Sequence, residues 1–247
     1  MRRSSPLERN NKKRSLTHYM LYKFPTVNLK DICNDIKPFD LILSRGPNIA
    51  SRVIREAEEI TRGCSLFSHV GMFINYEAFP DARLQKDNSW YILESLLHGD
   101  PEVLNIDKSC SGGVQIRPLY DQLISDTEHV MTYVHAPLRA QIRDQIDLTA
   151  ASTVIKKFLN KPYDDNPVDI SDALEPKSCV CLKTLFGQKN SDKSFFCSEL
   201  ACRIFQEFHI ITKYIRPDSV LPVDFLPGVD FGFPPIVNER LLKQIEF

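Results

Sequence analysis

Apolar runs along the chain predict short strands that are separated by polar loops. The run 66–76, LFSHVGMFINY, is apolar on both faces and rich in aromatic and branched residues, which predicts a buried strand. A second run, 90–97, WYILESLL, follows a polar loop that contains proline, so the two runs predict neighbouring antiparallel strands. The second run is short enough to fit a helical turn as well. Further strands are predicted at 39–43 and 113–117.

Three other segments show the period of an amphipathic helix. They are residues 47–61, which Gly63 closes, residues 138–159, which stop before Pro162, and the segment that Cys197 opens. Helices packed on a mostly antiparallel sheet make an α+β domain. The apolar stripes consist of Ile49, Val53, Ala57 and Ile60 in the first segment, of Leu138, Ile142, Ile146, Ile155 and Leu159 in the second, and of Leu200, Ala201, Ile204, Phe205 and Phe208 in the third.

Charge divides the chain into a basic tail and one domain. Residues 1–17 hold six Lys or Arg side chains against one Glu and few apolar residues, which predicts a disordered tail. Such a tail is solvated, or it makes weak contacts with nucleic acid or an acidic surface, and no other nucleic-acid partner is expected. Residues 18–247 are predicted to form a single domain, in which the polar segment 164–195 is an insertion or a lid.

The overall composition is that of an ordinary globular protein. The 247 residues are 43% hydrophobic and 26% charged, with a net charge of −1, which does not indicate a nucleic-acid or membrane surface. No apolar run approaches the ~18 residues that span a bilayer. The basic N-terminus has no apolar segment of a secretory signal, and the seven cysteines are an odd number. Free thiols and a cytoplasmic location are therefore expected.

His69 and Glu94 interrupt the two apolar runs. Of the six histidines, only His69 lies inside a buried-strand pattern, and its small neighbours Ser68 and Gly71 leave room around the ring. A buried carboxylate such as Glu94 is costly without a partner. If the two runs are adjacent strands, His69 is the natural partner, and a carboxylate on one imidazole nitrogen raises the basicity of the other. A backbone amide or an arginine could also pair with Glu94, and a lone strand histidine is commonly a satisfied core residue.

Cys197 lies where an aromatic run changes to a helical pattern. As a small hydrophobe it could simply be buried. In the first turn of a helix, however, free amides and the macrodipole favour the thiolate. A thiolate at a helix start, an imidazole on a strand and a carboxylate behind it are the nucleophile, base and orienting group of covalent acyl transfer. We therefore expect Cys197 in an open cleft, close to His69 and Glu94.

Four short motifs resemble one known family. They are Ser68–Met72 (SHVGM), Glu94 within its apolar run, Lys161–Asp164 (KPYD) and Phe196–Leu200 (FCSEL). Across residues 38–226 the chain resembles the YaeF/YiiX group of circularly permuted, papain-like enzymes in the NlpC-like superfamily, a group with poxviral members. The resemblance implies a permuted papain-like α+β fold and a cysteine hydrolase of the amidase or peptidase type. For a viral member the location would be the host cytoplasm or the virion.

The resemblance also implies roles for individual residues. By position, Cys197 is the nucleophile, His69 the general base and Glu94 the orienting acid, while Tyr163 falls where the family has a tyrosine that lines the site. The substrate would be a peptide or lipid with an amide or ester bond, and no cofactor or metal is implied. Phe39 departs from the family, whose members tend to have glycine at this position.

Three alternatives remain open. Cys179 and Cys181, together with Cys197 and Cys202, offer four thiols, but their spacing is not that of a standard zinc site. Relatives of lecithin:retinol acyltransferase also have histidine before cysteine and form an acyl-cysteine from lipid esters. Those relatives carry an Asn-Cys-Glu-His box, where this chain has Phe-Cys-Ser-Glu. A non-catalytic binding or virion protein could also retain the fold.

Overall fold

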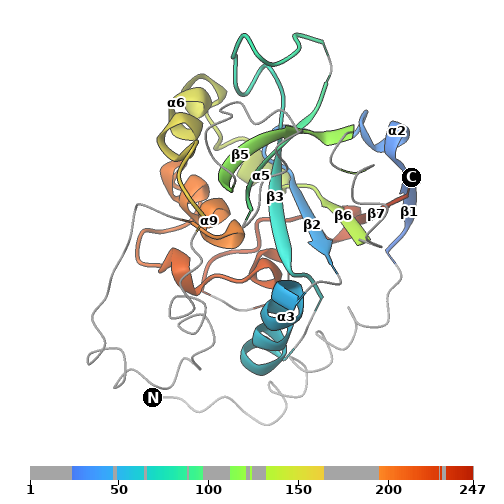
Figure 1. Cartoon of the computed structure of the whole chain (residues 1–247), viewed down its shortest axis with the longest axis vertical. Helices are drawn as coiled ribbons and strands as arrows, with labels where there is room; N and C mark the ends of the chain where they lie inside the picture. Colours follow the sequence, from blue (N-terminus) through green and yellow to red (C-terminus); the bar gives the residue numbers. More distant parts are fainter. Residues whose placement is uncertain are drawn as a thin grey trace.

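The computed structural model centres on a mixed but mostly antiparallel sheet (Figure 1). The structure describes residues 24–46, 49–63, 66–87, 89–96, 112–120, 123, 132–163, 195–227, 229 and 232–246. The strands in these ranges are β1 (Thr26–Asn28), β2 (Leu41–Arg45), β3 (His69–Ile74), β4 (Tyr91–Leu96), β5 (Gly113–Pro118), β6 (Thr132–Ala136) and β7 (Lys243–Glu246).

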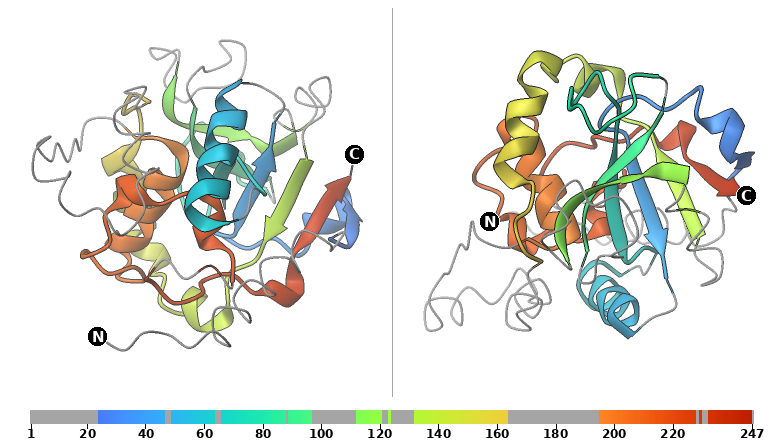
Figure 2. Two further views of the ribbon diagram at one scale, coloured as in Figure 1. Left: turned by 90° about the horizontal axis from the view of Figure 1, so that it is seen from below. Right: turned by 45° about the horizontal axis from the view of Figure 1, so that its top comes forward.

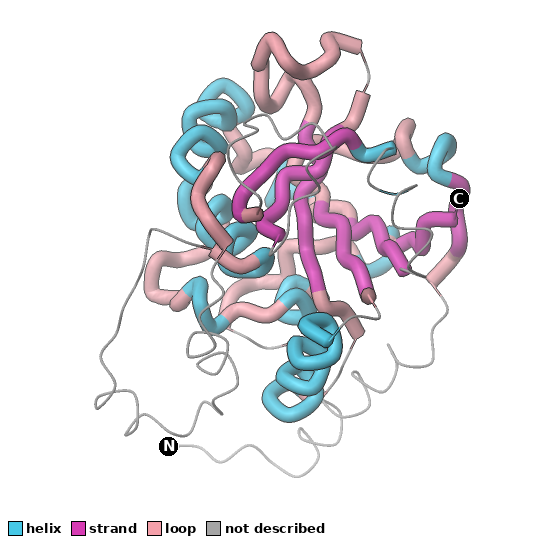
Figure 3. The backbone as a smooth tube through the Cα atoms, in the orientation of Figure 1, coloured by secondary structure: helices cyan, strands magenta, loops and turns pink. Residues whose placement is uncertain are grey.

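The order of the strands places β3 and β4 side by side, as the two long apolar runs predict. Within the described residues the sheet has seven strands in the order β1-β7-β6-β2-β3-β4-β5. Neighbours are antiparallel except for the parallel pair of β1 and β7. The architecture is therefore α+β, as expected, and Figure 3 shows the strands as one continuous layer.

Helices cover both faces of this sheet. The helices in the described ranges are α2 (Leu29–Ile32), α3 (Ile49–Arg62), α5 (Ala140–Arg143), α6 (Leu148–Phe158) and α9 (Cys197–Glu207), with three short 3₁₀ turns at Pro217–Ser219, Pro222–Phe225 and Glu239–Leu241. One sheet face carries Val70, Met72 and Leu93 and packs against α6 and α9. The other face carries Phe73 and Ile92 and packs against α2. In Figure 2, α6 and α9 lie together on one side of the sheet.

The predicted strands are confirmed, with one shift. β3, β4 and β5 form at the predicted runs, so the helical alternative for 90–97 is wrong. The strand expected at 39–43 begins two residues later, as β2, because Phe39 has φ 67° and does not continue an extended chain. The ring of Phe39 is fully buried and packs edge-on against Phe208, with ring centroids 5.1 Å apart. A positive φ favours glycine, so a phenylalanine at this position is uncommon.

Two of the three predicted helices are confirmed, and the third is divided. α3 ends before Gly63, whose φ of 72° is that of a helix-terminating glycine. The segment 138–159 forms α5 and α6 instead of one helix. Asp147 caps the start of α6, because its carboxylate accepts the backbone amide of Thr149. An aspartate in the middle of an apolar stripe therefore marked a helix start.

α3 is held to the domain by buried polar groups. The carboxylate of Glu58 is fully buried and accepts the backbone amides of Phe67 at 3.3 Å and Val223 at 2.9 Å, and burial raises the pKa of Glu58 to about 8. Arg62 binds both oxygens of Asp224, at 2.6 and 2.8 Å. Ile60, by contrast, is 74% exposed, so it is not part of the core despite its helical spacing.

The basic tail 1–17 and the polar segment 164–194 lie outside the described residues, and so do residues 18–23. The predictions of a disordered tail and of an insertion or lid are thus not tested. In the described ranges no helix combines the length and the apolar character that crossing a bilayer requires.

Candidate active site

Cys197 is the first residue of α9. The preceding residue, Phe196, is extended, and the helix starts at the change from aromatic run to helical stripe that the sequence shows. The side chain of Ser198, the next residue, donates a hydrogen bond to the carbonyl of Val220 at 2.6 Å, which ties the first turn to the C-terminal part of the chain. On the other side, Ser95 of β4 donates to the carbonyl of Phe195 at 2.5 Å. The start of α9 is therefore fixed from both sides.

His69 is the first residue of β3 and faces Glu94 of β4. The Nε2 atom of His69 lies 2.8 Å from Oε2 of Glu94. The side chain of Glu94 is only 4% exposed, whereas that of His69 is 20% exposed. Cys197 is the other partner of His69, and the two groups interact closely enough for each to shift the pKa of the other. Since Nε2 is bonded to Glu94, the other ring nitrogen, Nδ1, is left for Cys197.

The electrostatics of this group favour an ion pair between thiolate and imidazolium. Burial alone would raise the pKa of Cys197, but the charge of His69, its hydrogen bond and the amides of Val70 and Ser198 together lower that pKa below its usual value. Burial likewise opposes a charge on His69, but Cys197 and then Glu94 raise the pKa of the ring above its usual value. The two opposite shifts have the same cause, because each group stabilises the charged form of the other.

Arg117 of β5 is a second partner of Glu94, and sequence reasoning did not single it out. Its Nη1 atom lies 3.5 Å from Oε1 of Glu94, and both side chains are buried. Arg117 and Glu94 point to the same face of the sheet, because Arg117 pairs with Ile92, two residues before Glu94. Charges of alternating sign thus run from Cys197 through His69 and Glu94 to Arg117. The only signal in the sequence is the position of Arg117 at the end of an apolar strand.

Gly71 allows the close approach of β3 to β4 beside the dyad of His69 and Glu94. A Cβ atom at this position would lie 2.6 Å from Cγ2 of Ile92, 3.2 Å from Cγ2 of Ile42 and 3.5 Å from Cβ of Glu94. The first distance is far below van der Waals contact, and all three neighbours belong to the sheet.

Replacing Gly71 by alanine should separate β3 from β4 and lengthen the contact between His69 and Glu94. We expect a loss of about 1–3 kcal/mol in the free energy of unfolding, measured by denaturant titration, and at least a tenfold lower reactivity of Cys197 toward iodoacetamide at pH 6. Gly63→Ala is the matched control, since no atom lies within 4 Å of its Cβ position and only its φ of 72° strains the change. Equal reactivity of Cys197 in both variants would contradict this role of Gly71.

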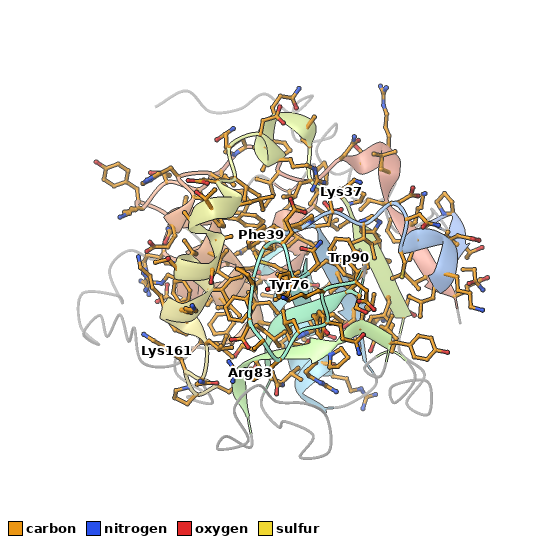
Figure 4. All side chains as sticks on the ribbon, turned by 90° about the horizontal axis from the view of Figure 1, so that it is seen from above. Lys37, Phe39, Tyr76, Arg83, Trp90 and Lys161 are labelled. Atoms are coloured by element: carbon orange, nitrogen blue, oxygen red, sulfur yellow. The ribbon has the colours of Figure 1, made fainter. Side chains whose placement is uncertain are left out.

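Tyr163 lies beside the residues that lead into Cys197. It forms an isolated parallel bridge with Phe195, and the amide of Phe195 donates to the carbonyl of Pro162 at 3.0 Å. The side chain of Tyr163 is half-buried. The Lys-Pro-Tyr motif is thus next to the segment before α9, which places its backbone near Cys197. Figure 4 labels Lys161, the first residue of this motif.

The expectation that Cys197 lies in an open cleft is wrong for its side chain, which is only 2% exposed. A pocket among the described residues lies elsewhere. It has a volume of about 380 Å³ and includes Tyr91, which pairs with Ile74, at the far end of β3 from His69. Trp90 and Arg83, labelled in Figure 4, also line it. The lining of this pocket therefore does not include Cys197, His69 or Glu94, and His69 is the most exposed of these three residues.

A second buried histidine was missed, and the statement that only His69 lies in a buried strand is wrong. His135 of β6 is 1% exposed, and its Nε2 lies 3.0 Å from Oδ2 of Asp40. Asp40 also accepts a hydrogen bond from Arg143 at 2.5 Å and one from the backbone amide of Leu138 at 2.8 Å. The alternating pattern of residues 132–136, TYVHA, was the available signal. This group has no thiol among its partners and joins β6 to the loops before β2 and α5.

The other cysteines differ from Cys197. Burial raises the pKa of Cys202 far above its usual value and raises that of Cys33 as well. Cys64, Cys110, Cys179 and Cys181 lie outside the described residues, so the alternative zinc site is not tested. In the described ranges, no cluster of three or more His, Cys, Asp or Glu side chains is arranged to hold a metal ion.

The comparisons with known proteins give a weak structural similarity. No protein-family model matches the chain, and no curated protein matches it. Among solved structures, the chain is similar to the metalloprotein yiiX from Escherichia coli O157:H7, with 13% sequence identity and a TM-score of 0.39. The similarity covers 85% of this chain and 96% of that protein.

Proposed function

We propose that this protein is a cysteine hydrolase of the amidase or peptidase type, a member of the YaeF/YiiX group with a permuted papain-like fold. The observation that carries the proposal is the placement of His69 between Glu94, to which it is hydrogen-bonded, and the thiol of Cys197 at the start of α9, with which it interacts electrostatically. The chain order of histidine, acid and cysteine supports the family assignment. The packing of the cysteine helix on the mostly antiparallel sheet that carries the histidine supports it as well.

In the first half of the reaction, the thiolate of Cys197 attacks the carbonyl carbon of an amide or ester. A carbon–sulfur bond forms, and the carbonyl electron pair moves to the oxygen. The imidazolium of His69 then donates its proton to the leaving nitrogen or oxygen as that bond breaks, which leaves an acyl-cysteine and a neutral imidazole. The backbone amide of Cys197 and the hydroxyl of Tyr163 are the donors that we assign to the oxyanion.

In the second half, water replaces the leaving group. Neutral His69 removes a proton from a water molecule, whose oxygen attacks the thioester carbon. Collapse of this intermediate releases the carboxylic acid and restores the thiolate of Cys197 beside a protonated His69. Glu94 stabilises the imidazolium in both halves and holds the ring in orientation. Arg117, a positioning residue, balances the buried charge of Glu94.

The reactivity of Cys197 toward iodoacetamide tests the proposal without knowledge of the substrate. The lowered pKa of the thiol and the raised pKa of the imidazolium widen the pH range in which the ion pair exists, so Cys197 should carry a larger thiolate fraction at pH 6 than an ordinary thiol does. An ordinary thiol of pKa ~8.5 is less than about 1% ionised at that pH. We therefore expect iodoacetamide at pH 6 to label Cys197 before the other six cysteines, as measured by peptide mass mapping.

The pH profile and one variant serve as controls for this labelling. The rate at Cys197 should decline only as the pH falls through the lowered pKa of its thiol, whereas the rates at ordinary cysteines should rise toward pH 8.5. His69→Ala should remove the preference for Cys197 at pH 6. Faster labelling of Cys179 or Cys181 than of Cys197 in the folded protein would show that the nucleophile is wrongly assigned.

A further inference from the structure

Three arginines gather at the end of the sheet where His69 lies. Arg45 is the last residue of β2, and its neighbour Ser44 pairs with His69 in the sheet register. Arg52 and Arg55 follow in the first two turns of α3, whose start lies close to this end of β2 and β3 (Figures 1 and 2). These residues, Arg45, Arg52 and Arg55, are called the arginine cluster below.

A short series of hydrogen bonds connects the arginine cluster to His69. Nη1 of Arg55 donates to the carbonyl oxygen of Gly46 at 2.6 Å. The amide of Gly46 donates to Oγ of Ser68 at 3.3 Å, and the amide of Ser68 donates to the carbonyl of Ser44 at 2.9 Å. Ser68 directly precedes His69. The guanidinium of Arg55 is thus held within a few bonded contacts of the proposed general base.

The arginine cluster concentrates positive charge, and the buried carboxyl of Glu58 opposes it only at Arg55, where its effect on the pKa is smaller than those of burial and of the other two arginines. Arg45 and Arg52 are exposed, and neither makes an ion pair or side-chain hydrogen bond with a described residue. Burial, followed by the charges of Arg45 and Arg52, lowers the pKa of Arg55, so the three guanidinium groups repel one another. The carboxylates of Glu56 and Glu59, which are also exposed on α3, form no ion pair with the cluster among the described residues.

The position of the arginine cluster at the start of a helix adds to this electrostatic repulsion. The first turn of α3 contains no acidic residue, and cations near a helix start are opposed by the macrodipole. An anion at this place would relieve both kinds of repulsion, because guanidinium groups bind carboxylate and phosphate oxygens with paired hydrogen bonds.

We propose that Arg45, Arg52 and Arg55 bind an anionic group, a carboxylate or a phosphate, on the acyl substrate of Cys197. This inference rests on the proposed function and specifies its substrate class: an amide or ester with a negative charge near the scissile bond. The anionic group binds at the end of β2 and the start of α3, and the carbonyl carbon reaches Cys197 past the exposed edge of His69.

A pair of alkylating reagents of the same size measures the effect of the cluster at Cys197. Iodoacetate carries a negative charge and iodoacetamide does not. The rate constant of iodoacetate at Cys197 divided by that of iodoacetamide therefore reports on anion binding there. In Arg45→Glu/Arg52→Glu this ratio should fall about tenfold at low ionic strength, and about 1 M salt should reduce it in the wild type as well. Arg240→Glu is the matched control, because Arg240 is an exposed arginine near β7, which is two strands away from β2 in the sheet order, and the change should leave the ratio unchanged.

Competing anions distinguish the two sources of negative charge. Inorganic phosphate should slow the alkylation by iodoacetate more strongly than acetate if the natural substrate carries a phosphate, and less strongly if it carries a carboxylate. If Arg45→Glu/Arg52→Glu does not fold, as judged by circular dichroism, the uncharged variant Arg45→Gln/Arg52→Gln is used in its place.

The outcomes separate this inference from the function on which it rests. If iodoacetamide labels Cys197 first but the ratio is the same in the wild type and both cluster variants, the arginine cluster does not bind the substrate, and the hydrolase proposal stands. If iodoacetamide shows no preference for Cys197, the proposed function itself fails. A tenfold fall in the cluster variants, with none in Arg240→Glu, supports both.

Discussion

Replacing Cys197 by alanine should lower turnover by at least about 10³-fold, because no acyl-enzyme can form without the sulfur. The measurement is a panel of peptide, isopeptide and lipid-ester substrates, incubated with the wild type and the variant under identical conditions. The panel also distinguishes an amidase or peptidase from a lipid acyltransferase, which would use the same thiol on lipid esters. The turnover of Cys197→Ala relative to the wild type, on the substrate that the wild type cleaves fastest, gives the size of the effect.

Cys202→Ala is the matched control for this substitution. Cys202 lies in the same helix, is fully buried, and has a pKa that burial raises, so it has no part in the proposed chemistry. Replacing Cys202 should remove only a fraction of the free energy of unfolding, and it should leave the turnover of the folded protein within about twofold of the wild-type value. If the wild type cleaves a substrate and Cys197→Ala cleaves it equally fast, the nucleophile is another group. If neither cleaves any substrate and Cys197 shows no enhanced reactivity, the protein is not a cysteine hydrolase and the alternative of a non-catalytic binding protein is favoured.

The second large effect is expected for Glu94→Gln, which should reduce turnover by about 10²–10⁴-fold. The amide has the size of the carboxylate but cannot stabilise the imidazolium, and it can present an NH₂ group to Nε2 of His69. The variant should also be less stable by roughly 3–5 kcal/mol, because it leaves Arg117 buried without its counter-charge. Denaturant titration measures the loss of stability.

A double variant separates the catalytic role of Glu94 from its structural role. In Glu94→Gln/Arg117→Gln both buried charges are absent, so part of the lost stability should return while turnover stays low. Recovery of turnover together with stability would mean that Glu94 acts only on folding. Undiminished turnover in Glu94→Gln alone would exclude any role in orienting His69.

The local elements of the site are predictable because short-range patterns specify them. β3 and β4 are continuous apolar runs with β-branched and aromatic residues, and α9 starts where the helical stripe begins. The polar residues His69 and Glu94 stand out because burying them without partners would be too costly. From these patterns the sequence indicated three residues that the structure brings into contact. Their catalytic roles remain proposals.

The tertiary structure decided how distant segments pair. His69 and Glu94 are 25 residues apart, Asp40 and Arg143 are 103 apart, and Arg62 and Asp224 are 162 apart. No periodic pattern of residues in the sequence predicts such pairs, because their interaction energy comes from contacts that exist only after the sheet has formed.

The same reason applies to Arg117, His135 and the arginine cluster. Their interaction partners are defined only in the folded chain. Arg117 is an isolated charge at a strand end until the register of β4 and β5 places it behind Glu94. The sequence determined which residues could do chemistry at a buried position. Tertiary packing decided which charges would meet there, because desolvation and Coulomb energies depend on distances that chain spacing does not contain.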